Sequence, residues 1–211
     1  MGDEPHDQSA SEEDAKAVLR RLRKTSKELP SLKETVDYLL EILAVEGHGS
    51  DRLLALFAGS LIEVGLEVRL HHLMRRDLTV DEYNQIFSAD RNGFLATFGA
   101  RIAIGYALNI FGPKALADLK TINVIRNTFA HSLQPLHFDD PDIRTLCFSL
   151  QDYDDAASNI ELPRTFLAFR STSRSTAKHR FINASVSIAA NLQLLIKDVD
   201  TQIIYTRRPL P

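Results

Sequence analysis

The chain has 211 residues, of which 44% are hydrophobic and 25% charged, a length that can bury one sizeable core. Its formal net charge of −3 at pH 7 argues against general electrostatic binding of duplex DNA, which requires a basic face. The one cysteine, Cys147, excludes an internal disulfide and a cysteine-rich zinc site, and it fits a reducing compartment.

Residues 1–46 are predicted to form a helical arm. Ser9 and Glu12 have the spacing of a capping box, and acidic residues then precede basic ones, which suits the helix macrodipole. Pro30 ends this helix, and the same Ser-x-x-Glu signature recurs at 31–34. Because the first helix carries few apolar residues, we expect it to lie outside the core or to mediate assembly.

Residues 47–205 are predicted to form an all-α, up-down helical bundle, with a tail at 206–211. Gly47-His48-Gly49 is expected to be a turn, and Thr79 with Glu82 is expected to cap a short helix. The helices expected in chain order cover 50–74, 81–87, 95–111, 113–131, 141–150 and 176–200. The turns and loops expected between them cover 92–93, 152–159 and 171–176. The stretch 165–170 is ambiguous, because a short strand there would have nothing to pair with.

The sequence predicts a cytoplasmic protein that does not associate with membranes. Its N-terminus is polar and acidic, unlike a signal peptide. The longest apolar run extends from Leu53 to Met74, and a membrane-spanning helix rarely tolerates several ionisable groups. This run is interrupted by Glu63, Glu67, Arg69 and His71.

The segment 125–132 holds the most informative combination of polar side chains. It places Arg126, Asn127 and His131 in an apolar, predicted helix. Asn127 and His131 are four residues apart and share one helical face, with Arg126 on the neighbouring face. A permanent cation, an amide and a group that titrates near neutrality can together bind or cleave a phosphodiester. The same groups can equally pin one helix to another.

The spacing Arg-x4-His is weak by itself, because it recurs by chance and has a second instance at Arg174 and His179. The structural alternative pairs Arg126 and His131 with carboxylates such as Glu63 or Glu67. Neither interpretation requires a metal or another cofactor, and none is predicted.

Longer stretches surround this motif. They are FSADRNGFLATFGARI at 87–102, YALNI at 106–110, DL at 118–119, IRNTFAHS at 125–132 and FD at 138–139. Together they resemble the mannitol-operon repressor (MltR) family, over about residues 50–195. Arg126-Asn127 and His131 also look like the Arg-polar-x3-His signature of the wider HEPN group of helical bundles. Asn109 departs from the family pattern, in which a glycine is expected.

The resemblance implies an HEPN-like bundle with a peripheral N-terminal helix, assembled as a homodimer. The first class of function it implies is a regulator linked to transcriptional repression. The sequence shows no helix-turn-helix with a basic recognition helix, so we expect such a regulator to act through a protein partner and not by specific reading of duplex DNA. Arg126, Asn127 and His131 would then lie at a functional or interface groove.

The second class implied is a metal-independent endoribonuclease, with RNA as the ligand. A 2′-hydroxyl would attack the neighbouring phosphorus while His131 moves protons and Arg126 holds the phosphorane oxygens. Asn127 would orient His131 or the phosphate. Because one copy of the motif supplies one histidine, acid and base would come from two copies of the chain.

Polar side chains also recur along the predicted helix 50–74, at Glu63, Glu67 and His71. A metal site there would need further ligands, so none is predicted. Arg101 stands in an apolar helix, where an unpaired charge would be costly. We therefore predict a structural ion pair of Arg101 with Glu63 and Glu67.

Between residues 162 and 196 the sequence has no acidic residue. Bases interleaved with aromatics can bind single-stranded nucleic acid, so this stretch is a weak candidate site. The favoured alternative is that its phenylalanines are core and its bases balance the acidic residues of 139–155. The basic residues concerned are Arg164, Arg170, Arg174, Lys178 and Arg180.

Overall fold

The computed structural model describes residues 34, 37, 38, 41, 48–75, 77–151 and 176–205, with side chains at all of these except 48–50 and 193–205. All of them belong to 31–211, the longer of two units of the chain. Nearly all of the predicted arm at 1–46 lies outside the described residues. The tail at 206–211 and the predictions for 152–159, 165–170 and 171–175 also fall outside them.

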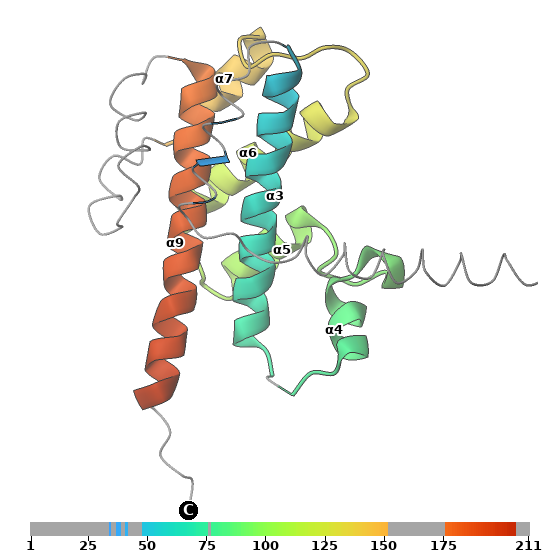
Figure 1. The fold of residues 1–211 in the computed structure, drawn as a ribbon, viewed down its shortest axis with the longest axis vertical. Coiled ribbons are helices and arrows are strands. Elements are labelled where there is room, and N and C mark those ends of the chain that lie inside the picture. The colour runs from blue at the N-terminus through green and yellow to red at the C-terminus, as the bar shows by residue number, and fades with distance from the viewer. Residues whose placement is uncertain are drawn as a thin grey trace, which may run out of the picture. The chain divides into compact units, whose positions relative to one another are not determined.

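Every regular element in these described segments is helical and no strand occurs among them, so the prediction of an all-α fold is confirmed. None of the described helices has the length and apolar character that a membrane crossing needs. The elements, shown in Figure 1, are α3 (His48–Leu73), α4 (Val80–Phe87), the 3-10 helix η1 (Ala89–Arg91), α5 (Phe98–Ala107), α6 (Pro113–His131), α7 (Pro141–Ser149) and α9 (Ala177–Tyr205).

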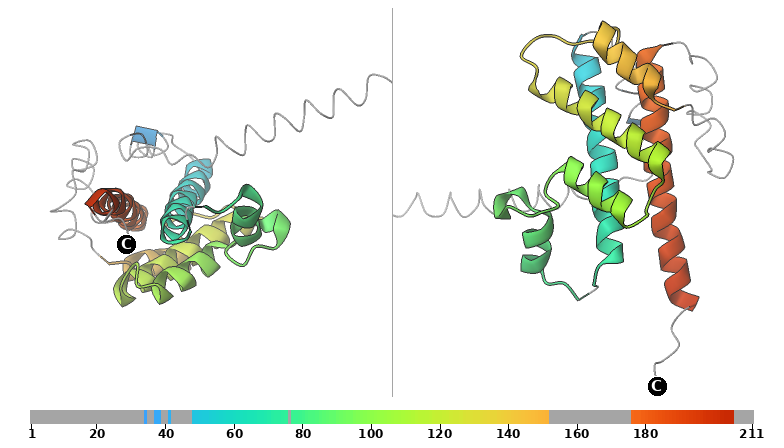
Figure 2. Two further views of the ribbon diagram at one scale, coloured as in Figure 1. Left: turned by 90° about the horizontal axis from the view of Figure 1, so that it is seen from below. Right: turned by 180° about the vertical axis from the view of Figure 1, so that it is seen from behind.

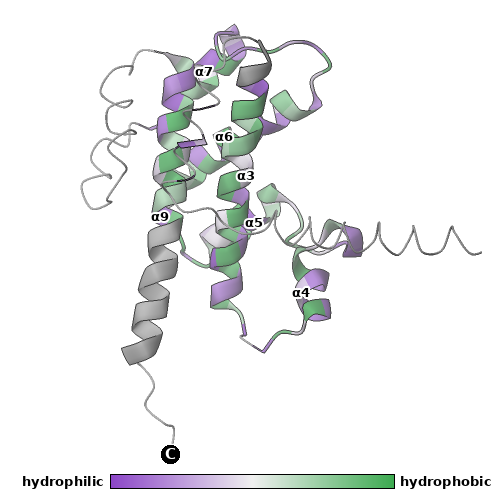
Figure 3. Ribbon diagram, in the orientation of Figure 1, coloured by the Kyte–Doolittle hydropathy of each residue, from purple (hydrophilic) through white to green (hydrophobic). Residues whose placement is uncertain are grey.

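The two longest described helices, α3 and α9, run parallel and side by side (Figure 1). Near their starts, Lys178 Nζ lies 2.7 Å from Asp51 Oδ1. Further along, Leu192 packs 3.4 Å from where a Cβ of Gly65 would lie. Both contacts have the same offset in sequence, so the register of the two helices is constant. Figure 3 shows apolar residues recurring along α3 and along the first half of α9, as expected for a buried seam.

Helices α5 and α6 lie together on one face of the α3–α9 pair (Figure 2). Three fully buried phenylalanines join α6, the segment before α7, and α9. The ring centroid of Phe138 lies 5.1 Å from that of Phe129 and 5.1 Å from that of Phe181. Such aromatic pairs contribute about 0.5–1.5 kcal/mol beyond the area they bury. This aromatic cluster ties α6 to α9 through Phe138.

The capping box predicted for α4 is confirmed. The Thr79 hydroxyl accepts from the Glu82 amide, and Glu82 Oε2 accepts from the Thr79 amide at 2.8 Å. The turn predicted at 47–49 is wrong for His48 and Gly49, because α3 begins at His48. First-turn amides lack helical acceptors in any case, so a glycine there does not interrupt the ladder. Helix α9 also extends past the predicted residue 200.

Helix α5 is shorter than the predicted 95–111. The Leu95 amide donates to the Ile86 carbonyl at 2.8 Å, which ties Leu95 to α4. The Thr97 hydroxyl then caps the helix by accepting from the Ala100 amide at 3.2 Å. Beyond its last residue, Asn109 has φ 57°, a left-handed conformation that asparagine adopts more readily than most residues. Asn109 thus adopts a backbone geometry that glycine adopts without steric cost.

Candidate functional site

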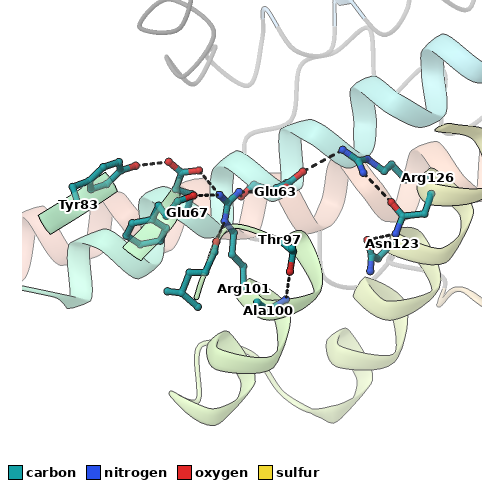
Figure 4. A network of polar contacts seen from close by, with 11 residues as sticks. Glu63, Glu67, Tyr83, Thr97, Ala100, Arg101, Asn123 and Arg126 are labelled. Atoms are coloured by element: carbon teal, nitrogen blue, oxygen red, sulfur yellow. Dashed lines mark hydrogen bonds and ion pairs between the residues drawn. The ribbon is translucent and has the colours of Figure 1, made fainter. Parts of the chain in front are cut away.

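Arg126 lies across the contact between α6 and α3. A Cβ built on Gly59 of α3 would come 2.6 Å from Cγ and 3.0 Å from Cβ of Arg126, so the glycine makes room for the arginine stem. At its tip, Arg126 Nη2 lies 3.5 Å from Glu63 Oε2, and Nη1 donates to Asn127 Oδ1 at 2.8 Å (Figure 4). The helix crossing thus directs this guanidinium along α3.

The charge of Arg126 is only partly compensated. Its side chain is 28% exposed, and its Nε is buried without a hydrogen-bond partner. The carboxylate that pairs with it among the described residues, Glu63, also faces Arg101. The sequence left two outcomes open for Arg126, open to solvent or paired with an acid, and the structure shows an intermediate arrangement. An under-satisfied guanidinium of this kind can accept an additional anion.

Asn127 is oriented by its own helix. Its oxygen accepts from Arg126, and its Nδ2 donates to Asn123 Oδ1 at 3.2 Å. No hydrogen bond joins Asn127 to His131 within the described part of the chain. Asn127 is thus placed to orient Arg126, whereas the sequence had suggested His131 or a phosphate.

His131 is the last residue of α6, and it is exposed. It forms no hydrogen bond or ion pair with any residue that the structure describes. The structure therefore places Arg126, Asn127 and His131 on the last turns of one helix, and a hydrogen bond joins only the first two of them.

Arg52 is a neighbouring cation that sequence reasoning missed. Its Nη2 donates to the carbonyls of Ser132 and Gln134 at 2.6 and 3.4 Å, where the negative end of the α6 dipole favours a cation. No described carboxylate pairs with it. The only sign of this role in the sequence is the spacing from Gly59. Arg52 precedes Gly59 by seven residues, which is two turns back on the same face of α3.

A polar network runs from α4 through α3 to α6 (Figure 4). Arg101, which is buried, is its centre: Nη2 lies 2.8 Å from Glu67 Oε2, and Nη1 lies 3.3 Å from Glu63 Oε1. Its Nε donates to the Leu95 carbonyl at 2.8 Å. Tyr83 extends the network by donating its hydroxyl to Glu67 Oε1. The structure thus brings together the three residues predicted to form a structural ion pair.

Burial is the main influence on Glu63, and it raises the pKa of this carboxyl above the usual range. The guanidiniums of Arg101 and then Arg126 oppose this rise in pKa, and Glu67 adds to it. Burial and the bond to Glu67 likewise raise the pKa of the Tyr83 hydroxyl, which stays a donor. The network thus pairs two carboxylates with two guanidiniums, and burial disfavours the charged form of Glu63.

His71 does not join this network as a metal ligand. It is exposed, and its ring packs edge-on against Tyr83 with centroids 5.1 Å apart. Among the described residues, no group of three or more histidine, cysteine or acidic side chains could hold a metal ion.

The weak nucleic-acid site is represented in the structure by two of its five bases. Lys178 pairs with Asp51, and Arg180 Nε donates to the Leu150 carbonyl at 3.1 Å. Phe181, from the same stretch, is core. Phe181 thus agrees with the alternative that the phenylalanines are core, whereas Lys178 pairs with an acid outside 139–155. The other bases, Arg164, Arg170 and Arg174, lie outside the described residues.

The described part of the chain is an all-α bundle. It contains a buried ion-pair network, and the last member of this network is the partly exposed Arg126 on α6. No family model matches the chain, and no curated protein or solved structure matches it at a significant level. The likeness to the mannitol-operon repressor family is therefore carried by the sequence motifs and enters below as a proposal.

Proposed function

We propose that this chain is a cytoplasmic regulator of the mannitol-operon-repressor type that acts through a protein partner and does not read duplex DNA. One observation carries the proposal: the exposed end of α6 combines apolar and titratable residues. Val124 and His131 are exposed on the same side of the helix, and Leu133, just beyond it, is 97% exposed. Exposed apolar residues beside polar ones are typical of protein interfaces.

Three hydrogen bonds hold the turn that carries Leu133. The Ser132 amide donates to the Thr128 carbonyl at 3.0 Å, and the Gln134 amide donates to Ser132 Oγ at 3.1 Å. Arg52 holds the Ser132 carbonyl at 2.6 Å. A backbone held in place before binding loses little conformational entropy on contact with a partner, which favours affinity. Leu133 therefore has the properties of an interface anchor.

The same face is poorly suited to duplex DNA. The exposed basic residues of α6 are Lys114, Lys120 and His131, and no exposed arginine accompanies them on this helix. Duplex binding draws most of its affinity from many simultaneous phosphate contacts. Regulation through a protein partner is thus the better physical match.

A reporter driven by the promoter of a mannitol operon tests the regulator. In cells that encode this chain, its deletion should raise reporter expression in the absence of mannitol, and the intact gene should restore repression. Leu133→Asp should lose most of that repression, because burying a carboxylate at an anchor costs about 2 kcal/mol or more. Val80→Asp is the control, since Val80 is exposed on α4, away from this turn. An unchanged reporter, or specific duplex binding at physiological salt, would contradict the proposal.

A metal-independent endoribonuclease is the second candidate. The observation that favours it is the hydrogen bond from Arg126 to Asn127, which preorganises a guanidinium within two turns of the exposed His131. Preorganised donors aimed at developing charge are a major source of catalysis. In this mechanism two copies of the chain supply the two histidines.

This candidate predicts that the protein cuts single-stranded RNA in the presence of EDTA and leaves 2′,3′-cyclic phosphates. His131→Ala should lower the cleavage rate by about 10²–10⁴, the usual contribution of a general acid or base. His71→Ala, which removes another exposed histidine, should leave the rate unchanged. Mass spectrometry of the products and a cleavage time course measure both effects. Equal rates in the two variants would exclude His131 as the catalyst.

A further inference from the structure

The carboxylate that faces Arg126 is loosely held. Glu63 Oε2 lies 3.5 Å from Arg126 Nη2 and Glu63 Oε1 lies 3.3 Å from Arg101 Nη1, whereas Glu67 approaches Arg101 to 2.8 Å. Charge-assisted hydrogen bonds at full strength measure about 2.7–2.9 Å. Arg101 is therefore bound mainly by Glu67, and Glu63 makes two weak contacts.

The cost of an added anion in this cluster depends on Glu63. While nothing else is bound, the negative charges of the two carboxylates balance the positive charges of the two guanidiniums. A phosphate at Arg126 would add negative charge beside Glu63, whose side chain is only 17% exposed. Uncompensated charge at so buried a position is expensive. An anion can therefore bind Arg126 tightly only when Glu63 no longer pairs with this arginine.

We propose that Glu63 is a built-in competitor, which occupies Arg126 until a backbone phosphate of single-stranded RNA replaces it. On replacement, Glu63 keeps Arg101 and releases Arg126. Nε of Arg126, which is buried and has no hydrogen-bond partner, can then form a hydrogen bond when the side chain moves outward. This inference rests on the second function proposed above and adds a regulating residue to it.

A strand fits this surface better than a lone phosphate. Arg52, which no described carboxylate neutralises, stands two turns of α3 before Gly59, whereas the Arg126 guanidinium contacts Glu63, one turn after Gly59. The two cations thus lie at different points along α3, and a strand with a phosphate at every nucleotide can contact both. Inorganic phosphate is therefore expected to compete poorly for the site.

The test measures the affinity of the full chain for a fluorescein-labelled oligouridine by fluorescence anisotropy at low salt. Glu63→Gln keeps the side-chain shape and removes the charge, so the dissociation constant should fall about tenfold, as removal of one nearby charge in a partly buried site allows. Glu67→Gln is the matched control, because Glu67 pairs with Arg101 and not with Arg126. The double variant Glu63→Gln/Arg126→Ala should lose the gain.

Each outcome decides a separate point. If Arg126→Ala weakens binding but Glu63→Gln does not strengthen it, Arg126 remains an RNA-binding residue and the competitor role of Glu63 is wrong. If Glu67→Gln strengthens binding as much as Glu63→Gln, the effect is one of overall charge and the inference is overturned. If no variant binds RNA, the second function and the inference both fail. Should Glu63→Gln not fold, Glu63→Leu, of similar size, repeats the comparison.

Discussion

Arg101→Ala is expected to lower the free energy of unfolding by about 3–5 kcal/mol, the usual cost of removing one partner of a buried ion pair. The side chain is only 6% exposed and satisfies Glu63, Glu67 and the Leu95 carbonyl together. Its loss leaves two buried carboxylates facing each other and one carbonyl without a donor. Urea denaturation followed by far-UV circular dichroism measures the change.

An exposed ion pair provides the control for this prediction. Arg91 Nη2 lies 3.7 Å from Asp81 Oδ1 with both side chains more than half exposed. Such pairs contribute about 0–1 kcal/mol, so Arg91→Ala should barely move the transition. Arg101→Lys should recover only part of the loss, because one ammonium cannot reach the three acceptors that the guanidinium bridges. Equal midpoints for Arg101→Ala and Arg91→Ala would show that the network does not stabilise the fold.

Local signals predicted the helices whose boundaries are set by nearby residues. The Thr79–Glu82 capping box fixes the start of α4, and Pro113 opens α6 as expected at a first helical position. In each case the atoms that decide the boundary are within a few residues of it. The all-α class follows from the same periodic patterns, which do not depend on how the helices pack.

Boundaries set by distant contacts were not predictable. An apolar pattern continues through Leu95 and Ile110, so the sequence predicts one helix across both. The structure instead ties Leu95 to the Ile86 carbonyl and turns the chain at Asn109. The glycine expected at position 109 in the family pattern was the one available sign of that turn. The asparagine in this chain also favours a left-handed backbone conformation, but less strongly than glycine.

The candidate site likewise has a part that the sequence predicts and a part that it does not. The partners of Arg101 could be predicted because an arginine in an apolar helix requires buried acids, and Glu63 and Glu67 were the acids at hand. The surroundings of Arg126 could not, because they depend on where α6 crosses α3. Gly59 and Arg52 gain their roles only from that crossing. Neither residue belongs to a motif, so no pattern in the sequence distinguishes them.

Gly59→Ala tests that crossing directly. Because the new Cβ would lie 2.6 Å from Cγ of Arg126, close to the backbone end of the side chain, α6 or the whole arginine must shift. Overpacking of this kind costs about 1–3 kcal/mol. The variant should therefore unfold at lower urea, and the contacts of Arg126 with Glu63 and Asn127 should be lost.

Gly65→Ala, on the same helix, is the matched control for this prediction. A Cβ there would meet Leu192, with Cδ1 at 3.4 Å and Cβ at 3.7 Å, which are ordinary van der Waals distances. Alanine is favoured over glycine inside a helix by about 0.5–1 kcal/mol, so this variant should be as stable as the parent or slightly more so. Comparison of the two urea midpoints separates contact with Arg126 from helix propensity, which is common to both substitutions. If Gly59→Ala stabilised the protein as Gly65→Ala does, the stem of Arg126 would not lie against α3, and the site would have to be placed elsewhere on α6.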